Sequence, residues 1–368
     1  MDFRLDPEQQ ALRTAAGDVL RQHCPPQRVQ QLWADGCRCD EVLWSELGQL
    51  EWFGMCAPES AGGMGLGLVE LSLIAEQLGY ASAVGPIVPT LAAGAVLGRA
   101  PRSDLVDTVL CELVAGKQRI AIGTQRQDPM VAGMDADRLR AQAHRNDLII
   151  SGTLPFAPWA KEADAILIPL THPSGGAGMA LVDSRAGGVS VTPLGNIDGG
   201  TDWGHVSFND VVAKSNAWLD VDPVWVSNVQ AISAAAEILG ACRRCLDISV
   251  EYAGIRRQFG RPIGSFQAVR HMCADMYVGI ENLGSVVAYA AAALEAGTDS
   301  AGTFTAIAAI AASQVGTKVW TNALQVHGGV GFTWEYELHL HLKRIMALQG
   351  VLGSSDSHAE RILASAIS

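Results

Sequence analysis

The chain has 368 residues, enough for two or three domains and for a large buried core. It carries 26 basic and 38 acidic side chains, a formal net charge of -12, which excludes a broad basic surface for nucleic acid but not a local cationic clamp. Because 49% of the residues are hydrophobic and only 17% are charged, the composition also excludes an intrinsically disordered chain.

Residues 1–117 predict an N-terminal helical domain. Pro7 suits the first turn of a helix whose apolar residues, such as Leu12 and Val19, follow at helical spacing. Leu43 and Leu47, four residues apart, predict a second helix, and 68–78 a third.

Residues 118–216 predict a middle β domain, either a barrel or a sandwich. Short alternating or β-branched segments are separated by turns that contain glycine or Asn-Asp. The expected strands lie at 119–122, 148–151, 165–169, 179–182, 189–192 and 205–208.

Residues 217–368 predict a C-terminal four-helix bundle. Apolar residues recur every three or four positions from Ile232 to Ala253, and Ala-rich helices are expected around 285–295 and 305–326. The fold class is therefore α+β, in the order helical, β, helical.

Cys242 and Cys245 form a CxxC pair, but no second pair or nearby histidine completes a zinc site. We therefore expect both side chains to pack on the apolar face of a helix, and we predict no metal site.

The apolar stretches and the N-terminus predict neither a membrane span nor a secretory signal. The most apolar stretch, 305–315, falls well short of the ~20 residues that a span needs. Met1–Asp6 shows no basic region followed by an apolar one. We therefore expect a cytoplasmic protein whose eight cysteines are reduced thiols.

Two motifs in the third domain contain residues suited to an anionic cofactor. The first contains Arg256, whose guanidinium can bind a pyrophosphate through paired charge-assisted hydrogen bonds. The second contains Gly328 and Gly329, which let the backbone approach a ligand closely. Taken singly, the Arg256-Arg257 pair could equally cap a helix, and the glycines could simply form a turn.

Together the two motifs resemble those of the acyl-CoA dehydrogenase family. They read Arg-x-Gln-Phe-Gly-x-Pro-Ile-x-x-Phe-Gln and Gln-x-x-Gly-Gly-x-Gly, with the family's spacing, and the domain order agrees across essentially the whole chain. The resemblance implies that these motifs reach across a subunit interface to the FAD of the neighbouring subunit. The residues that it assigns to FAD are Arg256, Gln258, Phe259, Gln267, Gln325, Gly328 and Gly329.

The family's catalytic base has no clear counterpart. The reaction removes the α-proton of an acyl-CoA thioester with a carboxylate while the β-hydride passes to the flavin. Counting forward from Gly331, Leu352 stands where most members have the glutamate. Other members place it early in the first bundle helix, but the first carboxylate there is Glu237, about two turns later. We predict no catalytic residue in this chain and keep Glu237 as the one candidate for a relocated base.

The middle domain departs from the family in two segments that meet the flavin ring. Around 123–130 nothing corresponds to the Thr-Glu-Pro-x-x-Gly-Ser-Asp loop. Where the family has Trp-Ile-Thr or Trp-Ile-Ser, this chain has Phe156-Ala157-Pro158, and proline offers neither a hydroxyl nor a backbone N–H.

These one-sided losses resemble the non-catalytic subunit of the α2β2 acyl-CoA dehydrogenases of bacterial sterol side-chain breakdown. The first hypothesis is therefore a chain that shares FAD with a homologous catalytic partner. That partner would hold the acyl-CoA, for which a bulky steroid is one expected acyl group, and would pass electrons to an electron-transfer acceptor. One alternative is a self-sufficient homotetrameric dehydrogenase that uses Glu237. Another is a flavin-free scaffold or binding protein.

Overall fold

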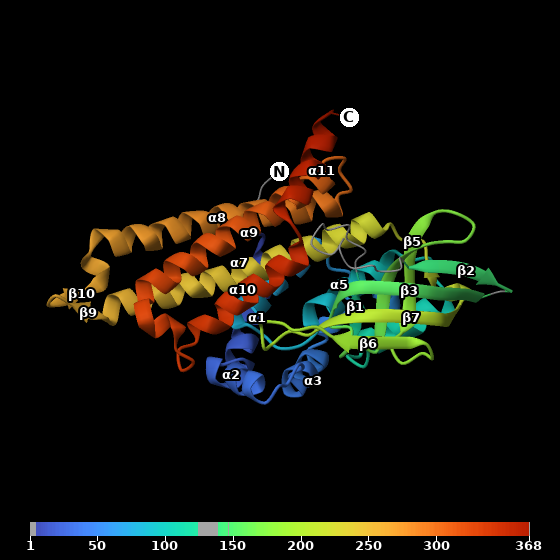
Figure 1. Cartoon of the computed structure of the whole chain (residues 1–368), viewed down its shortest axis with the longest axis horizontal. Coiled ribbons are helices and arrows are strands. Elements are labelled where there is room, and N and C mark those ends of the chain that lie inside the picture. Colours follow the sequence, from blue (N-terminus) through green and yellow to red (C-terminus); the bar gives the residue numbers. More distant parts are fainter. Residues whose placement is uncertain (1–4, 124–138, 146, 368) are drawn as a thin grey trace. The chain divides into compact units, whose positions relative to one another are not determined.

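The computed structural model describes residues 5–123, 139–145 and 147–367, which form two compact units (Figure 1). Unit 1 comprises Met1–Asp35, Ser72–Ala83 and Ala231–Ser368, and unit 2 comprises Gly36–Leu71 and Val84–Gln230. The N-terminal helical segment is therefore divided between the two units.

Unit 1 is helical apart from one small hairpin. Its elements are α1 (Pro7–His23), α2 (Pro26–Ala34), most of α4 (Leu68–Ala81), most of α7 (Pro223–Ile255), the hairpin β9 (Arg257–Gln258) and β10 (Arg261–Pro262), the 3-10 turn η4 (Ile263–Ser265), α8 (Gln267–Glu295), α9 (Ala301–His327), the 3-10 turn η5 (Gly328–Phe332), α10 (Leu338–Leu352) and α11 (Ser355–Ile367). The predicted C-terminal bundle is confirmed in α7 to α10, and α11 adds a fifth helix.

Capping and close packing explain two features of these helices. Asp6 caps α1 in a capping box with Gln9, and Pro7 occupies the first turn as predicted. Helix α4 packs against α7 at backbone distance, since a Cβ added at Gly240 would lie 1.8 Å from the Glu76 carbonyl oxygen. Cys242 and Cys245 are fully buried free thiols of α7, which confirms that they pack on the apolar face of a helix.

Unit 2 contains helices and two four-stranded sheets. Its helical elements are α3 (Glu41–Gln49), η1 (Trp52–Gly54), η2 (Glu59–Ala61), α5 (Ile87–Arg99), α6 (Asp104–Val114) and η3 (Ser215–Ala217). Its strands are β1 (Ile120–Ile122), β2 (Arg140–His144), β3 (Asp147–Pro158), β4 (Ala165–Thr171), β5 (Ala177–Asp183), β6 (Val189–Pro193), β7 (Trp203–Lys214) and β8 (Trp218–Leu219). The sheet orders are β1-β4-β5-β8 and β2-β3-β7-β6, antiparallel except for the parallel pair β1 and β4.

The predicted β domain is confirmed as two sheets around a shared core. Ile150 and Phe208 of one sheet lie in the same buried cluster as Ile166 and Val182 of the other. All six predicted strands are present, but β3 and β7 are 12 residues long, far longer than expected. Strands β2 and β8 were not predicted, because β2 is largely exposed and β8 has only two residues.

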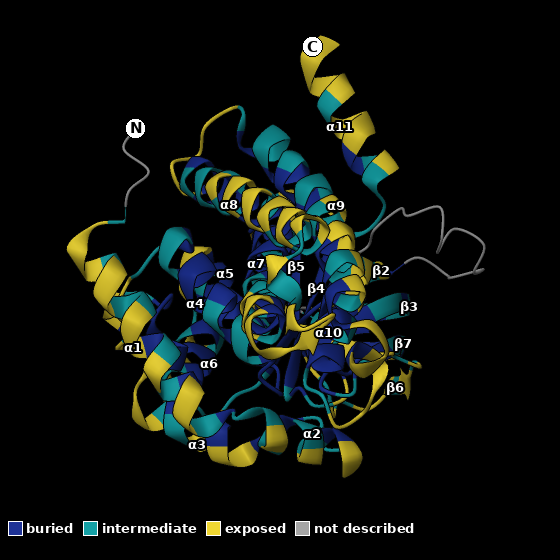
Figure 2. Ribbon diagram, turned by 90° about the vertical axis from the view of Figure 1, so that its left-hand side faces the viewer, coloured by how far each residue is buried: buried dark blue, intermediate teal, exposed yellow. Residues whose placement is uncertain are grey.

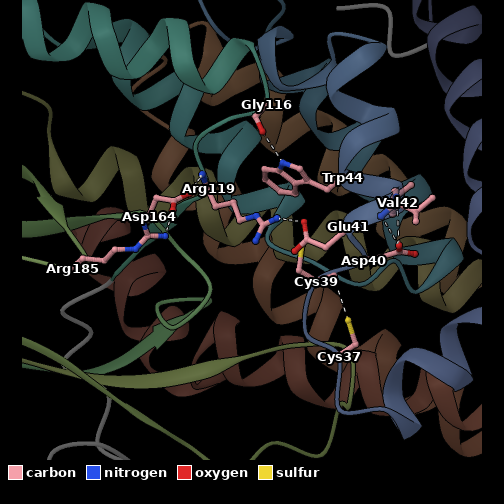
Figure 3. A network of polar contacts seen from close by, with 11 residues as sticks. Cys37, Cys39, Asp40, Glu41, Val42, Trp44, Gly116, Arg119, Asp164 and Arg185 are labelled. Atoms are coloured by element: carbon pink, nitrogen blue, oxygen red, sulfur yellow. Dashed lines mark hydrogen bonds and ion pairs between the residues drawn. The ribbon is translucent and has the colours of Figure 1, made fainter.

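A polar network fastens α3 to the sheet within unit 2 (Figure 3). The Arg119 guanidinium pairs with Glu41 and lies 5.0 Å from the centre of the Trp44 ring. The Arg119 backbone N–H donates to Asp164, and the Trp44 indole N–H donates to the Gly116 carbonyl. Arg119, which precedes β1, therefore links helix α3 to Asp164, which precedes β4.

Helix α8 is long and apolar enough, by length and composition alone, to cross a membrane, which the sequence reasoning did not anticipate. In the structure it packs along α9 and exposes one face, while residues such as Met276 and Ile280 are buried on the other (Figure 2). The central helices of soluble bundles share this length and composition.

Candidate functional site

The first motif forms a tight hairpin at the end of α7 (Figure 1). Gln258 pairs with Arg261 across β9 and β10, and the two-residue turn between them has positive φ at both positions, 51° at Phe259 and 79° at Gly260. Two such residues are typical of the tight turns that fit the twist of a hairpin. The turn presents Phe259 to solvent, and its side chain is 92% exposed.

This hairpin is a local cationic surface in an acidic chain. Arg256 is exposed, and its side chain makes no ion pair or hydrogen bond with any other described residue. Arg261 lies 4.2 Å over the Phe266 ring, and no acidic residue occurs between positions 256 and 270. An unpaired guanidinium beside exposed amide and aromatic side chains can bind a phosphate and cover a ring.

The second motif forms the turn that follows α9. Gly328 ends the helix with φ 60° and ψ -140°, a conformation that disfavours a side chain. A Cβ added at Gly328 or Gly329 would meet nothing within 4 Å, so this backbone faces open space. Gln325 is exposed one helical turn earlier. The turn therefore fits the close approach of a ligand to the main chain.

A cluster of three aromatic rings holds the two motifs at the same end of the bundle. Tyr252, one turn before Arg256, stacks on His327 with ring centres 4.6 Å apart, and His327 immediately precedes Gly328. The Tyr336 hydroxyl lies 3.1 Å from His327 Nε2. Sequence reasoning gave these rings no role, although Tyr252 lies one turn before the first motif and His327 lies within the second.

The sequence-predicted residues are thus on one end of unit 1, with Gln267 as the exposed first residue of α8, near His271. Their chemistry fits FAD: a guanidinium for pyrophosphate, amides for polar atoms, an exposed aromatic ring and an open glycine turn. Within the described part of the chain, no group of three or more potential ligands could hold a metal ion.

Glu237 lies elsewhere in unit 1, in an ion pair. Its Oε2 is 3.8 Å from Nη1 of Arg344, which is almost fully buried. The same arginine donates a 2.9 Å hydrogen bond to the Ala83 carbonyl. This pairing gives Glu237 a structural role between α4, α7 and α10.

Leu352 is the last residue of α10 and is 1% exposed. Gly353 follows with φ 83°, and His358 Nε2 lies 2.8 Å from the Leu352 carbonyl oxygen, so the turn is well defined. The next carboxylate along the chain, Asp356, is exposed in the first turn of α11. The position expected for a base therefore holds an apolar side chain.

In unit 2, Phe156, Ala157 and Pro158 end strand β3. Pro158 pairs with Trp203 at the strand end, and the Phe156 and Trp203 rings pack edge to face, 5.1 Å apart. Through these contacts, Phe156 and Pro158 contribute to packing within the sheet. The segment 124–138, which includes nearly all of the expected flavin loop, lies outside the described residues.

Comparison with known proteins identifies the class. The N-terminal domain of acyl-CoA dehydrogenases matches residues 6–116, and the C-terminal domain matches residues 225–367. This chain belongs to the acyl-CoA dehydrogenase family, a family of FAD-dependent oxidoreductases.

One curated protein and two solved structures show how similar this chain is to members of the family. Acyl-CoA dehydrogenase IpdE2 of Mycobacterium tuberculosis is 31% identical over 338 residues, which cover 92% of this chain and 90% of that protein. A chain in the crystal structure of the ChsE4-ChsE5 complex from Mycobacterium tuberculosis matches with a TM-score of 0.91 and 28% identity, over 100% of this chain and 99% of that one. A chain in the structure of a variant of the Tcur3481-Tcur3483 steroid ACAD matches with a TM-score of 0.88 and 28% identity over 98% of both.

Proposed function

We propose that this chain is the non-catalytic subunit of a heteromeric acyl-CoA dehydrogenase, which completes the FAD site of a homologous catalytic partner. The observation that carries the proposal is the contrast within unit 1. Arg256, exposed and unpaired among the described residues, is available to a second molecule, whereas the base position holds the buried Leu352.

The chain's own part in the reaction is to bind and orient. Arg256 would hold the pyrophosphate, Gln258 and Gln325 would meet polar groups, and Phe259 would cover an apolar face of the cofactor. When bound, FAD would supply the acceptor for the hydride that leaves the substrate's β-carbon. The partner would supply the glutamate base and the acyl-CoA pocket.

The names of two similar structures support a substrate class and an assembly for this chain. Two matching structures contain paired proteins by name, and one of those pairs is named a steroid ACAD. We infer a mixed α2β2 tetramer that acts on a bulky acyl-CoA, such as a steroid side-chain thioester, and passes electrons to an electron-transfer acceptor. The Glu237–Arg344 ion pair weighs against the alternative of a homotetramer that uses Glu237 as its base.

The test is co-expression with a homologous acyl-CoA dehydrogenase chain that keeps the glutamate base, followed by measurement of the flavin absorbance per chain and the mass of the complex. We expect a mixed tetramer with one flavin for every two chains. Arg256→Ala should weaken flavin binding roughly tenfold to a hundredfold, because a charge-assisted hydrogen bond is lost. Arg270→Ala, an exposed arginine outside both motifs, is the matched control.

Two results would contradict the proposal. Stoichiometric flavin and turnover from this chain alone would establish a self-sufficient enzyme. Unchanged flavin content in Arg256→Ala complexes would instead favour the flavin-free scaffold, which keeps the fold for association only.

A further inference from the structure

The first motif contains another arginine, Arg261, which the proposed function does not use. It lies on β10, where it pairs with Gln258 of β9. Its side chain is exposed, and its guanidinium makes no ion pair or hydrogen bond with any other described residue. The guanidinium lies instead over the Phe266 ring, 4.2 Å from the ring centre.

The pairing of the hairpin places Arg261 on the same face as Arg256. The Ile263 N–H donates a 2.8 Å hydrogen bond to the Arg256 carbonyl, which extends the pairing of β9 and β10 by one residue. Gln258 therefore shares a face with Arg256, two positions earlier on its strand, and with Arg261, directly opposite. Arg257, which lies between Arg256 and Gln258, belongs to the other face.

The contact with Phe266 prepares Arg261 to bind an anion. A guanidinium above a ring uses its flat face and keeps the N–H groups along its edge available. The Phe266 ring in turn packs edge to face against Phe259, with ring centres 6.1 Å apart. Because the Arg261 side chain is already held, less conformational freedom is lost when it binds a ligand.

We propose that Arg256 and Arg261 bind the FAD pyrophosphate together, which makes Arg261 a further cofactor-binding residue. The inference rests on the proposed function. Each phosphate of FAD carries a negative charge, and Arg256 alone would compensate only one of them. A second guanidinium on the same face of the hairpin pairs with the other phosphate through charge-assisted hydrogen bonds.

The test measures the Kd for FAD by equilibrium dialysis of the mixed complex with the catalytic partner. Arg261→Ala should weaken FAD binding about tenfold or more, because a charge-assisted hydrogen bond is lost. The matched control is Arg257→Ala, which removes the same charge from the opposite face. It should change the Kd by less than about threefold, since salt screens an exposed charge that makes no direct contact. Arg261→Lys keeps the charge but loses the planar fork, so its Kd should fall between those of the wild type and Arg261→Ala.

Two further measurements identify the group that Arg261 binds. ADP, which carries the pyrophosphate without the flavin, serves as a competitor. Arg261→Ala should weaken ADP and FAD binding by the same factor, because both ligands lose the same contact. At saturating FAD, the KM for the acyl-CoA substrate should stay unchanged in Arg261→Ala.

Size-exclusion chromatography establishes that each variant still assembles with the partner. If Arg256→Ala weakens FAD binding and Arg261→Ala does not, the proposed function stands and this inference fails. Equal losses in Arg257→Ala and Arg261→Ala would reduce the effect to net charge and would also overturn the inference. So would a raised KM for acyl-CoA with unchanged FAD binding, or an assembled Arg261→Lys complex that binds FAD as tightly as the wild type. A mixed complex that holds no flavin would overturn both this inference and the proposed function.

Discussion

Replacing Glu237 by glutamine separates a structural glutamate from a catalytic one. The carboxylate is 14% exposed and faces a guanidinium that is 2% exposed. Glutamine keeps the shape of the side chain and removes its charge. If the pair stabilises unit 1, the variant should lose stability and leave the chemistry of the complex unchanged.

The expected loss follows from the geometry of the pair. Breaking a fully buried ion pair costs about 3–5 kcal/mol, but this one is longer than a hydrogen bond and partly screened. Arg344 also keeps its hydrogen bond to Ala83. We therefore expect a loss of roughly 2 kcal/mol. With an unfolding entropy of about 2.1 cal/mol/K per residue, this lowers Tm by about 3 °C for the whole chain.

The assay is thermal unfolding of the purified chain or its complex, alongside acyl-CoA dehydrogenation by the co-expressed complex. Glu360→Gln, an exposed glutamate on α11, is the matched control and should leave Tm unchanged. An unchanged Tm together with lost turnover in Glu237→Gln would refute the structural role and establish Glu237 as the base.

Two further predictions concern stability. Gly240→Ala places a methyl group against the Glu76 carbonyl and should lower the free energy of unfolding by roughly 3 kcal/mol or more. The control is Gly254→Ala on the same helix, where the added methyl group meets nothing and should raise the free energy of unfolding by up to about 1 kcal/mol. Equal effects of the two substitutions would contradict the close packing of α4 and α7. Burial lowers the pKa of three histidines, namely His327, His339 and His341. Their contribution to stability is complete above the unfolded-state pKa of about 6.5 and is lost as the pH falls through the folded-state values, with a slope of at most about 4 kcal/mol per pH unit for all three. Tm should therefore drop between about pH 7 and about pH 5, and a flat profile would contradict the burial of these side chains.

Local sequence patterns predicted most of the helices and strands. Helical periodicity predicted α7 and α9, and the sequence of the first motif, Gln258-Phe-Gly-Arg261, coincides with a tight hairpin. The lengths of β3 and β7 were underestimated because each strand is stabilised by pairing with the other over its whole length, which a single segment does not reveal.

Features that depend on distant residues could not be predicted. Gly240 matters because α4 crosses α7 at that point, and no local turn marks it. The buried hydrogen bond between Ser82 and His341 joins residues that are 259 positions apart in the chain. Buried polar pairs of this kind leave no periodic pattern, because their spacing is set by helix packing and not by the sequence between them.

The end of the bundle that carries Arg256 also gains little stability from its own residues, and this bears on the assembly. Phe259 adopts a left-handed backbone conformation, which costs a residue with a side chain roughly 1–2 kcal/mol, yet its ring stays 92% exposed. Three arginines lie between positions 256 and 261 with no acidic residue among them, so they repel one another in the isolated chain. Strain, exposed aromatic surface and unpaired charge at one place are costs that a second molecule can offset by supplying phosphate and an apolar face. The stability of this hairpin should therefore rise when the complex with flavin forms, and its amide hydrogen exchange, fast in the chain alone, should slow in the complex.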